Sequence, residues 1–195
     1  KHDLLKQLFM SSRKKLNLEE RQSNHSIIKD RKLRSIQSIP GDKNEFLIKV
    51  WDQLSNTYFS KYQIQQLSDQ AKIIASSKGK TSILIKSRKN LIEIFIFTSN
   101  QPGLFFKTVQ SFENLSIETI DSDIHTTNDG LYALNTFICK HKILGGNLIQ
   151  RDIQNIQKKI IASIDSETPK SVTKAKPKTK KVFKHQTKVH ITDSS

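Results

Sequence analysis

The spacing of apolar residues changes character near residue 80, and this change constrains the fold of the 195-residue chain more than any other feature. Before it, apolar residues recur every three or four positions, which predicts amphipathic helices over residues 3–18, 24–39, 44–59 and 62–76. After it, short β-rich runs alternate with helix-like segments. The sequence therefore predicts an α+β protein with an N-terminal helical segment.

The second part of the chain predicts the element order of a ferredoxin-like domain. Strands are expected at Ser82–Ile85, Glu93–Thr98, Ile117–Thr127, Leu131–Cys139 and Gln186–Thr192, and helices at Leu104–Leu115 and Leu148–Ile164. From Glu93 onward this order is βαββαβ, an antiparallel sheet with helices on one face. We expect a helical segment at 1–80, this domain at 81–192, and a connection to further chain at 193–195.

The net charge of +15 is distributed unevenly. Residues 168–195 hold eight Lys, two Pro and one Asp, whereas residues 46–167 hold 14 basic and 11 acidic side chains. This composition predicts a solvated Lys/Pro-rich linker at 165–182 that buries too little apolar surface to become ordered. The alternative is a basic nucleic-acid-binding protein. Nucleic acid is the less favoured partner, because residues 168–195 lack Arg and have Phe183 as their one Phe, Trp or Tyr.

No catalytic or metal-binding constellation is visible in the sequence. The six His residues lack metal-site spacing, and the single cysteine, Cys139, excludes a Cys-based zinc cluster. Because Cys139 lies in an apolar strand, we interpret it as a buried structural thiol. Asp121 and Asp123 form either a cation-binding pair or an exposed strand face. No apolar run reaches the length of a membrane span. We therefore expect no catalytic residue, metal or membrane partner in this chain.

The turn at residues 100–104 is the most informative local feature. Asn100 is suited to cap the following helix, Pro102 to its first turn, and Gly103 to close approach of a backbone or ligand. Free N–H groups at a helix start attract anions, so the carboxylate of an amino acid is a candidate ligand. The alternative is a capped helix start without any ligand.

This turn resembles the Asp-x-Pro-Gly-Leu turn of the ACT domain, a small-molecule regulatory module of ferredoxin-like topology. The wider match resembles the first ACT domain of the bifunctional uridylyltransferase/uridylyl-removing enzymes, which modify the bacterial nitrogen regulatory protein PII. It rests on Glu93-Ile-Phe-Ile-Phe97, Asp123-Ile-His-Thr-Thr-Asn-Asp-Gly130 and Leu134-Asn-Thr-Phe137. Upstream, Val50-Trp-Asp-Gln-Leu54 and Tyr58-Phe59 are similar to the helical segment that precedes that domain, and Val182–Thr192 to its closing strand.

The resemblance implies a glutamine-sensing regulatory region of a cytoplasmic enzyme that couples nitrogen status to uridylylation of PII. The implied glutamine site is Asn100, Gln101, Pro102, Gly103 and Leu104, with Ile117 and Ile120 as its neighbouring wall. Asn100 stands where the family has Asp, so the negative charge that would attract the ammonium group of glutamine is missing. Sensing by a second ACT domain in cis is therefore an alternative.

The resemblance also implies domains whose motifs this chain lacks. Family members carry a nucleotidyltransferase domain, which uses magnesium and UTP, and a metal-dependent hydrolase domain. Because the chain begins with Lys1 instead of Met, we expect it to be a piece of such an enzyme. A ligand-free ACT-type interaction module, whose sheet pairs edge to edge, is the remaining alternative.

Overall fold

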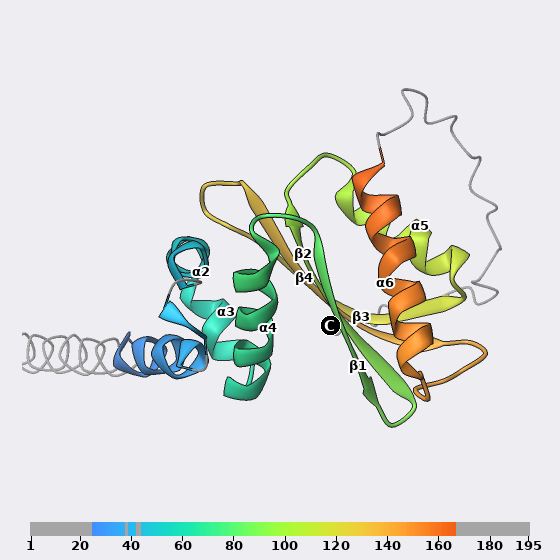
Figure 1. Ribbon diagram of the computed structural model, residues 1–195, viewed down its shortest axis with the longest axis horizontal. Helices are drawn as coiled ribbons and strands as arrows, with labels where there is room; N and C mark the ends of the chain where they lie inside the picture. Colours follow the sequence, from blue (N-terminus) through green and yellow to red (C-terminus); the bar gives the residue numbers. More distant parts are fainter. Residues whose placement is uncertain (1–24, 38, 42–43, 167–195) are drawn as a thin grey trace, which may run out of the picture.

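A computed structural model describes residues 25–37, 39–41 and 44–166 of the chain. A four-stranded antiparallel sheet lies between two groups of helices (Figure 1). The expected α+β class is confirmed. The predicted helix at 3–18, the closing strand at Gln186–Thr192 and all but the start of the predicted linker lie outside the described residues.

The elements follow the predicted order. The helices are a stretch over 25–36, then α2 (Asn44–Asp52), α3 (Asn56–Lys61), α4 (Ile64–Ser77), α5 (Leu104–Asn114) and α6 (Gln150–Asp165). The strands are β1 (Ser82–Arg88), β2 (Leu91–Ser99), β3 (Ile117–Thr126) and β4 (Tyr132–His141). β1 continues to Arg88, beyond its expected end at Ile85, so the loop to β2 consists of Lys89 and Asn90.

The prediction of a single helix over 44–59 is wrong, because the structure contains two helices there, α2 and α3. After Asp52 the chain tightens into a turn, in which the N–H of Gln53 donates to the carbonyl of Val50 (3.1 Å). The carbonyl of Gln53 then accepts from the N–H of Asn128, in the turn between β3 and β4 (2.8 Å). Ser55 is extended and is the N-cap residue of α3. Periodicity continues across the break, but a long-range backbone contact interrupts the helix.

The sheet order is β1-β2-β4-β3, and all neighbours are antiparallel. The succession β2-α5-β3-β4-α6 forms the first five elements of a βαββαβ plan, with β4 between β2 and β3. β1 pairs with the other side of β2 and is one edge of the described sheet, while β3 is the opposite edge.

The sheet is covered on both faces, instead of on one as the sequence led us to expect. On one face, Ile92, Ile94 and Ile96 share a hydrophobic cluster with α5 and α6. On the other, Phe95 and Phe97 share a cluster with α2, α3 and α4. Figure 1 shows these two groups of helices on opposite sides of the strands. The division into two domains near residue 80 stays a prediction, and apolar packing crosses that position.

The buried stripe of α5 is partly polar. The buried residues are Leu104, Lys107, Thr108, Ser111 and Phe112. Phe105 is 52% exposed, whereas Lys107 on the buried stripe reaches the carbonyl of Ile164 in α6.

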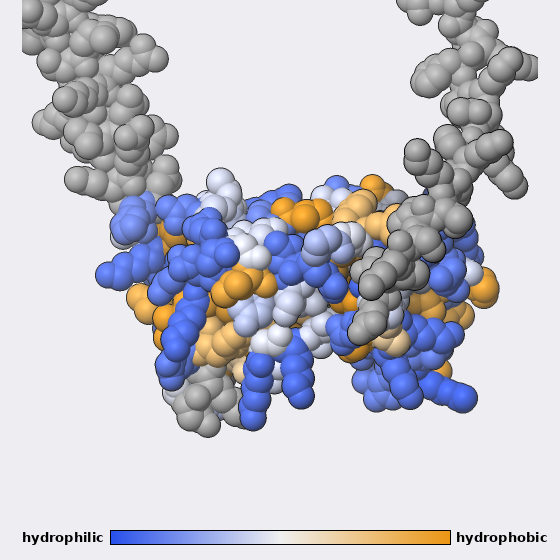
Figure 2. Space-filling model, turned by 90° about the horizontal axis from the view of Figure 1, so that it is seen from above, coloured by the Kyte–Doolittle hydropathy of each residue, from blue (hydrophilic) through white to orange (hydrophobic). Residues whose placement is uncertain are grey.

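The surface is mostly polar on the face shown in Figure 2, where hydrophobic residues form separate patches among hydrophilic ones. The large apolar side chains that are exposed include Phe105 and Phe106 on α5, and Ile120 and Ile124 on β3. Within the described part of the chain, no helix combines the length and the hydropathy needed to cross a membrane.

Candidate functional site

Asn100 does not cap α5, so this prediction is wrong. The N-cap is Gly103, and no side chain caps the helix. The backbone N–H of Asn100 instead donates to the carbonyl of Leu131 (2.8 Å), and its side-chain Nδ2 donates to the carbonyl of Gly130 (3.0 Å). Asn100 therefore fastens the loop to the β3–β4 turn.

The rest of the turn positions the start of α5. Gly103 has a φ of +75°, which a residue with a Cβ adopts only under strain. No heavy atom lies within 4 Å of the position that a Cβ would occupy there. Glycine is thus required by backbone conformation, whereas the predicted close approach is not seen. Pro102 is exposed in the turn just before the helix, and Leu104 is buried in the core.

Gln101 and Lys107 join this loop to the C-terminal end of α6. Nε2 of Gln101 donates to the carbonyl of Ile164 (3.0 Å). Nζ of Lys107, a residue only 6% exposed, donates to the carbonyls of Ile164 (3.3 Å) and Ser166 (2.6 Å). The last carbonyls of a helix lack intrahelical partners and carry partial negative charge, so a buried ammonium stabilises them. The loop and the end of α6 are therefore held as one unit.

A solvent-open hollow of about 510 Å³ lies beside this loop. It is formed by the segment after α4, the end of β2, Gln101 and the last turns of α6; the lining residues are Gly79, Lys80, Thr81, Thr98, Ser99, Gln101, Ile161 and Asp165. Its volume falls within the range of small-molecule sites, about 300–1,000 Å³.

Thr81 connects two other lining residues of this hollow, Thr98 and Asp165. Its hydroxyl lies 2.8 Å from that of Thr98, which is buried, and donates to Oδ1 of Asp165 (2.6 Å). Lys80 and Asp165 are both exposed and bring one positive and one negative charge to the hollow. The site thus offers hydroxyls, an amide, an ammonium and a carboxylate within one small volume.

The two wall residues predicted for the site lie elsewhere. Ile117 pairs with His141 at one end of the β3–β4 ladder, whereas Ser99 pairs with Tyr132 at the other end of β4. The nine residue-to-residue steps from Tyr132 to His141 correspond to roughly 30 Å of strand. Ile117 is buried in the core, and Ile120 is exposed at the irregularity between Thr119 and Asp121. Within one chain, the structure does not bring these two residues to the loop.

Sequence reasoning missed Lys107, Thr81 and Asp165. A local signal existed for Lys107, because a charged residue three positions after Leu104 and four before Ser111 falls on the buried stripe of α5. Nothing local marks Thr81 and Asp165, which are 84 residues apart in sequence.

A second polar cluster joins α3 to β3. The carboxylate of Asp123 accepts hydrogen bonds from the hydroxyl of Tyr62 (2.5 Å), Nζ of Lys61 (2.7 Å) and Nε2 of His125 (2.8 Å). Partial burial alone would raise the pKa of Asp123, but the bonds from Lys61, Tyr62 and His125 outweigh it and lower that pKa. Burial, followed by the bond to the negative Asp123, raises the pKa of Tyr62 well above its usual value.

Asp123 is therefore one partner in an ion-paired cluster, whereas Asp121 is exposed. The described residues hold no group of three or more His, Cys, Asp and Glu side chains suited to a metal ion. Cys139 is buried, which confirms its interpretation as a structural thiol.

These features define an α+β domain with a polar hollow beside its strand-to-helix loop. The chain is similar to a segment of the bifunctional uridylyltransferase/uridylyl-removing enzymes, as its sequence motifs indicate. It is 24% identical to that enzyme of Burkholderia lata over 153 residues, which cover 74% of this chain and 17% of the relative. The enzyme of Burkholderia vietnamiensis matches to the same extent.

A shorter match is found to the Acinetobacter baumannii enzyme of the same name, which is 26% identical over 96 residues, covering 46% of this chain and 11% of the relative. The chain thus spans less than a fifth of the length of these curated relatives. No protein-family profile and no solved structure matches the chain.

Proposed function

We propose that this chain is a glutamine-sensing regulatory region of a cytoplasmic uridylyltransferase/uridylyl-removing enzyme that acts on PII. The observation that carries the proposal is the joint occurrence of the similarity to these enzymes and the polar hollow beside residues 100–104. In this proposal, magnesium and UTP belong to catalytic domains outside the chain, and a second ACT domain follows in cis.

The order of elements supports an ACT-type fold for the sheet and its two later helices. β2, α5, β3, β4 and α6 match five of the six elements of βαββαβ, in the sheet order that places the third strand between the first and the second. The sixth, the predicted strand Gln186–Thr192, lies outside the described residues.

The hollow supplies complementary groups for each end of glutamine. The carboxylate of Asp165 attracts the ammonium group of glutamine. It thereby supplies the negative charge that is missing at Asn100. In this proposal, the ammonium of Lys80 attracts the carboxylate, and the half-buried amide of Gln101 faces the carboxamide. Charge-assisted hydrogen bonds of this kind are roughly twice as strong as neutral ones.

The hollow also contacts the segment through which a signal would reach the upstream helices. Lys78 ends α4 in a left-handed conformation (φ 51°) and Gly79 continues it (φ 83°). A Cβ on Gly79 would lie 3.8 Å from the ring of Phe46 and 3.2 Å from the hydroxyl of Tyr132. A ligand held by Lys80 and Thr81 would therefore act directly on the junction of α2, α4 and β4.

Isothermal titration with glutamine tests this proposal, with glutamate and asparagine as comparison ligands. We expect saturable heat for glutamine with this chain, or with a longer chain that includes the second ACT domain. Asp165→Asn is expected to weaken binding by about tenfold or more, since it removes a charged hydrogen-bond partner. Glu113→Gln, which removes one negative charge from α5, is the matched control. If neither chain gives saturable heat with glutamine, sensing is rejected.

The exposed apolar side chains support a docking surface for the second ACT domain. Phe105 on α5 and Ile120 and Ile124 on β3 are all about half exposed, and β3 is an edge strand with unpaired backbone groups on its outer side. We expect the longer chain to bury them. Gel filtration with and without glutamine then separates an internal docking site from self-association of a ligand-free interaction module.

A further inference from the structure

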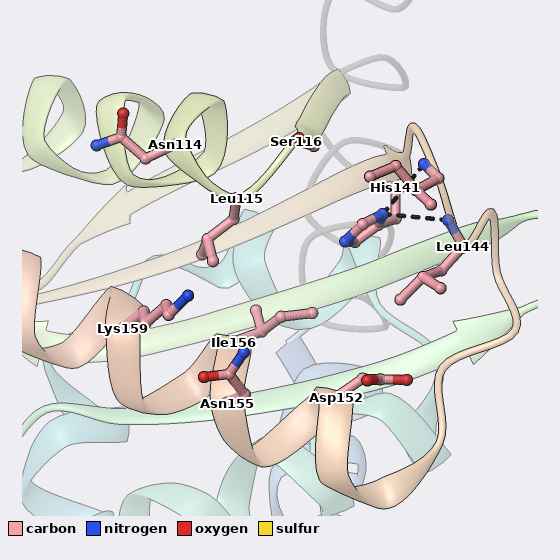
Figure 3. Close-up of a pocket in the computed structure, with 10 residues that line it drawn as sticks. Asn114, Leu115, Ser116, His141, Leu144, Asp152, Asn155, Ile156 and Lys159 are labelled. Carbon is pink, nitrogen blue, oxygen red and sulfur yellow. Dashed lines mark hydrogen bonds between the residues drawn. The ribbon is translucent and has the colours of Figure 1, made fainter.

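A second hollow, of about 250 Å³, lies at the opposite end of the sheet from the 100–104 loop (Figure 3). It is open to solvent and is bordered by the C-terminal end of α5, the end of β4 and one face of α6. We call it the His141 pocket; its polar lining residues are Asn114, Ser116, His141, Asp152, Asn155 and Lys159. This volume is enough for several waters or one small metabolite.

His141 is buried, with 8% of its surface exposed, and it turns one ring nitrogen into this pocket. Its Nδ1 accepts from the backbone N–H groups of Ile143 (3.3 Å) and Leu144 (3.2 Å). A nitrogen that accepts carries no proton, so the ring proton lies on Nε2. Figure 3 shows that nitrogen directed away from the loop and towards Leu115 and Ile156.

No described residue accepts the hydrogen bond that Nε2 of His141 offers. In the solvent-open pocket this donor is free to bind water or an acceptor group of a ligand. The turn that follows fixes the ring, because the N–H of Gly145 donates to the carbonyl of His141 (2.8 Å). The donor is therefore preorganised towards the pocket.

One face of α6 adds charges of both signs. Asp152, Asn155 and Lys159 are spaced three and four residues apart, which places them in one row along the helix. Oδ2 of Asp152 accepts from the N–H of Ile149 (3.2 Å), so this carboxylate caps the helix. The exposed side chain of Lys159 has no partner among the described residues, and Figure 3 shows it extending from α6 on the side of the pocket away from His141.

We propose that the His141 pocket binds a small monocarboxylate, whose carboxylate accepts from Nε2 of His141 and from Nζ of Lys159. Asp152 balances the charge of Lys159, so a second negative charge on the ligand is disfavoured, and an amino group on it is favoured. Dicarboxylates and phosphate are thus poor ligands. This site is separate from the hollow proposed for glutamine and does not depend on it.

The test is an NMR titration of the 195-residue chain labelled with ¹⁵N-histidine, in which His141→Gln identifies the His141 signal. The probes are acetate, glycine and inorganic phosphate at constant ionic strength. We expect acetate or glycine to shift the His141 signal saturably. Lys159→Met should weaken that binding by about tenfold, as expected for loss of a charged hydrogen bond. Lys158→Met removes the same charge from the neighbouring position, which does not line the pocket, and should leave binding unchanged.

Three results would overturn the proposal: a His141 signal that neither carboxylate moves, tighter binding of phosphate, or equal losses in the two lysine variants. Asp165→Asn, at the other hollow, should leave the response of His141 unchanged. Failure of glutamine sensing and failure of the His141 pocket are therefore distinguishable.

Discussion

The hydroxyl of Tyr62 donates a 2.5 Å hydrogen bond to Oδ2 of Asp123, and this pair joins the end of α3 to the edge strand β3. The two residues are 61 positions apart and belong to the helical and sheet parts of the molecule. The hydroxyl of Thr136, on β4, lies 2.9 Å from that of Tyr62. The cluster thus fastens the upstream helices to two strands.

Removal of the Tyr62 hydroxyl should loosen this attachment. We expect Tyr62→Phe to lower the free energy of unfolding by about 1.5–3 kcal/mol, the range for hydrogen bonds to charged groups. Urea unfolding followed by circular dichroism measures it. Tyr132→Phe is the control, because the Tyr132 hydroxyl makes no hydrogen bond to any described residue, and it should change stability by less than about 0.5 kcal/mol. Equal losses in both variants would argue against a specific Tyr62–Asp123 contribution.

Acid should weaken the same cluster. The pKa of Asp123 is lowered from 3.8, because bonds from Lys61, Tyr62 and His125 outweigh the opposing effect of burial. A pKa that is lower in the folded state stabilises the fold above about pH 4, and this contribution is lost as pH falls through the folded-state value. The stability difference between wild type and Asp123→Asn should therefore shrink between neutral pH and pH 2.5. Asp121→Asn, on the same strand, controls for net charge. A difference that is constant with pH would contradict the prediction.

Cys139 should resist thiol reagents in the native chain. It is fully buried, and burial raises the pKa of its thiol to about 11, partly offset by a hydrogen bond from Thr119. The reactive thiolate is therefore scarce at pH 8. We expect a chromogenic disulfide reagent to label it only as urea unfolds the chain. An added cysteine at exposed Ser122, on the neighbouring strand, should react at once in the native state and serves as the positive control. Rapid labelling of Cys139 without denaturant would show that the core opens there.

Gly146 should not tolerate a side chain. A Cβ there would overlap the carbonyl of Lys89 and lie 2.9 Å from the backbone nitrogen of Leu91, in the turn between β1 and β2. Overpacking against backbone typically costs about 1–3 kcal/mol, so Gly146→Ala should lower the thermal midpoint by several degrees. Gly41→Ala is the control, because no atom lies within 4 Å of its added Cβ. An unchanged midpoint in Gly146→Ala would mean that the two loops can separate.

The type and order of most elements follow from the sequence, because periodicity is a local property. The structure moves the ends of the helices at 62–76 and 148–164, and of the strand at 117–127, by two residues or fewer. The predictions from sequence were wrong where contacts between residues distant in the chain determine the local structure. The break between α2 and α3 depends on Asn128, and the direction of the Asn100 side chain depends on Gly130.

The candidate site divides in the same way. The sequence motif located the strand-to-helix loop at residues 100–104, since Pro and Gly mark turns through their own backbone preferences. It did not locate Thr81, Lys107 or Asp165, which meet the loop only after α4, α5 and α6 have packed around the sheet.

By itself, the sequence determined the α+β class, the element order, the turn and the similarity to a segment of uridylyltransferase/uridylyl-removing enzymes. Only the tertiary structure decided that helices cover both faces of the sheet and that the Tyr62–Asp123 hydrogen bond joins the end of α3 to β3. It also decided that two polar hollows form at opposite ends of the sheet. The physical reason is range. Propensity and periodicity act over a few residues, whereas burial, ion pairing and the shape of a hollow depend on residues brought together from distant parts of the chain.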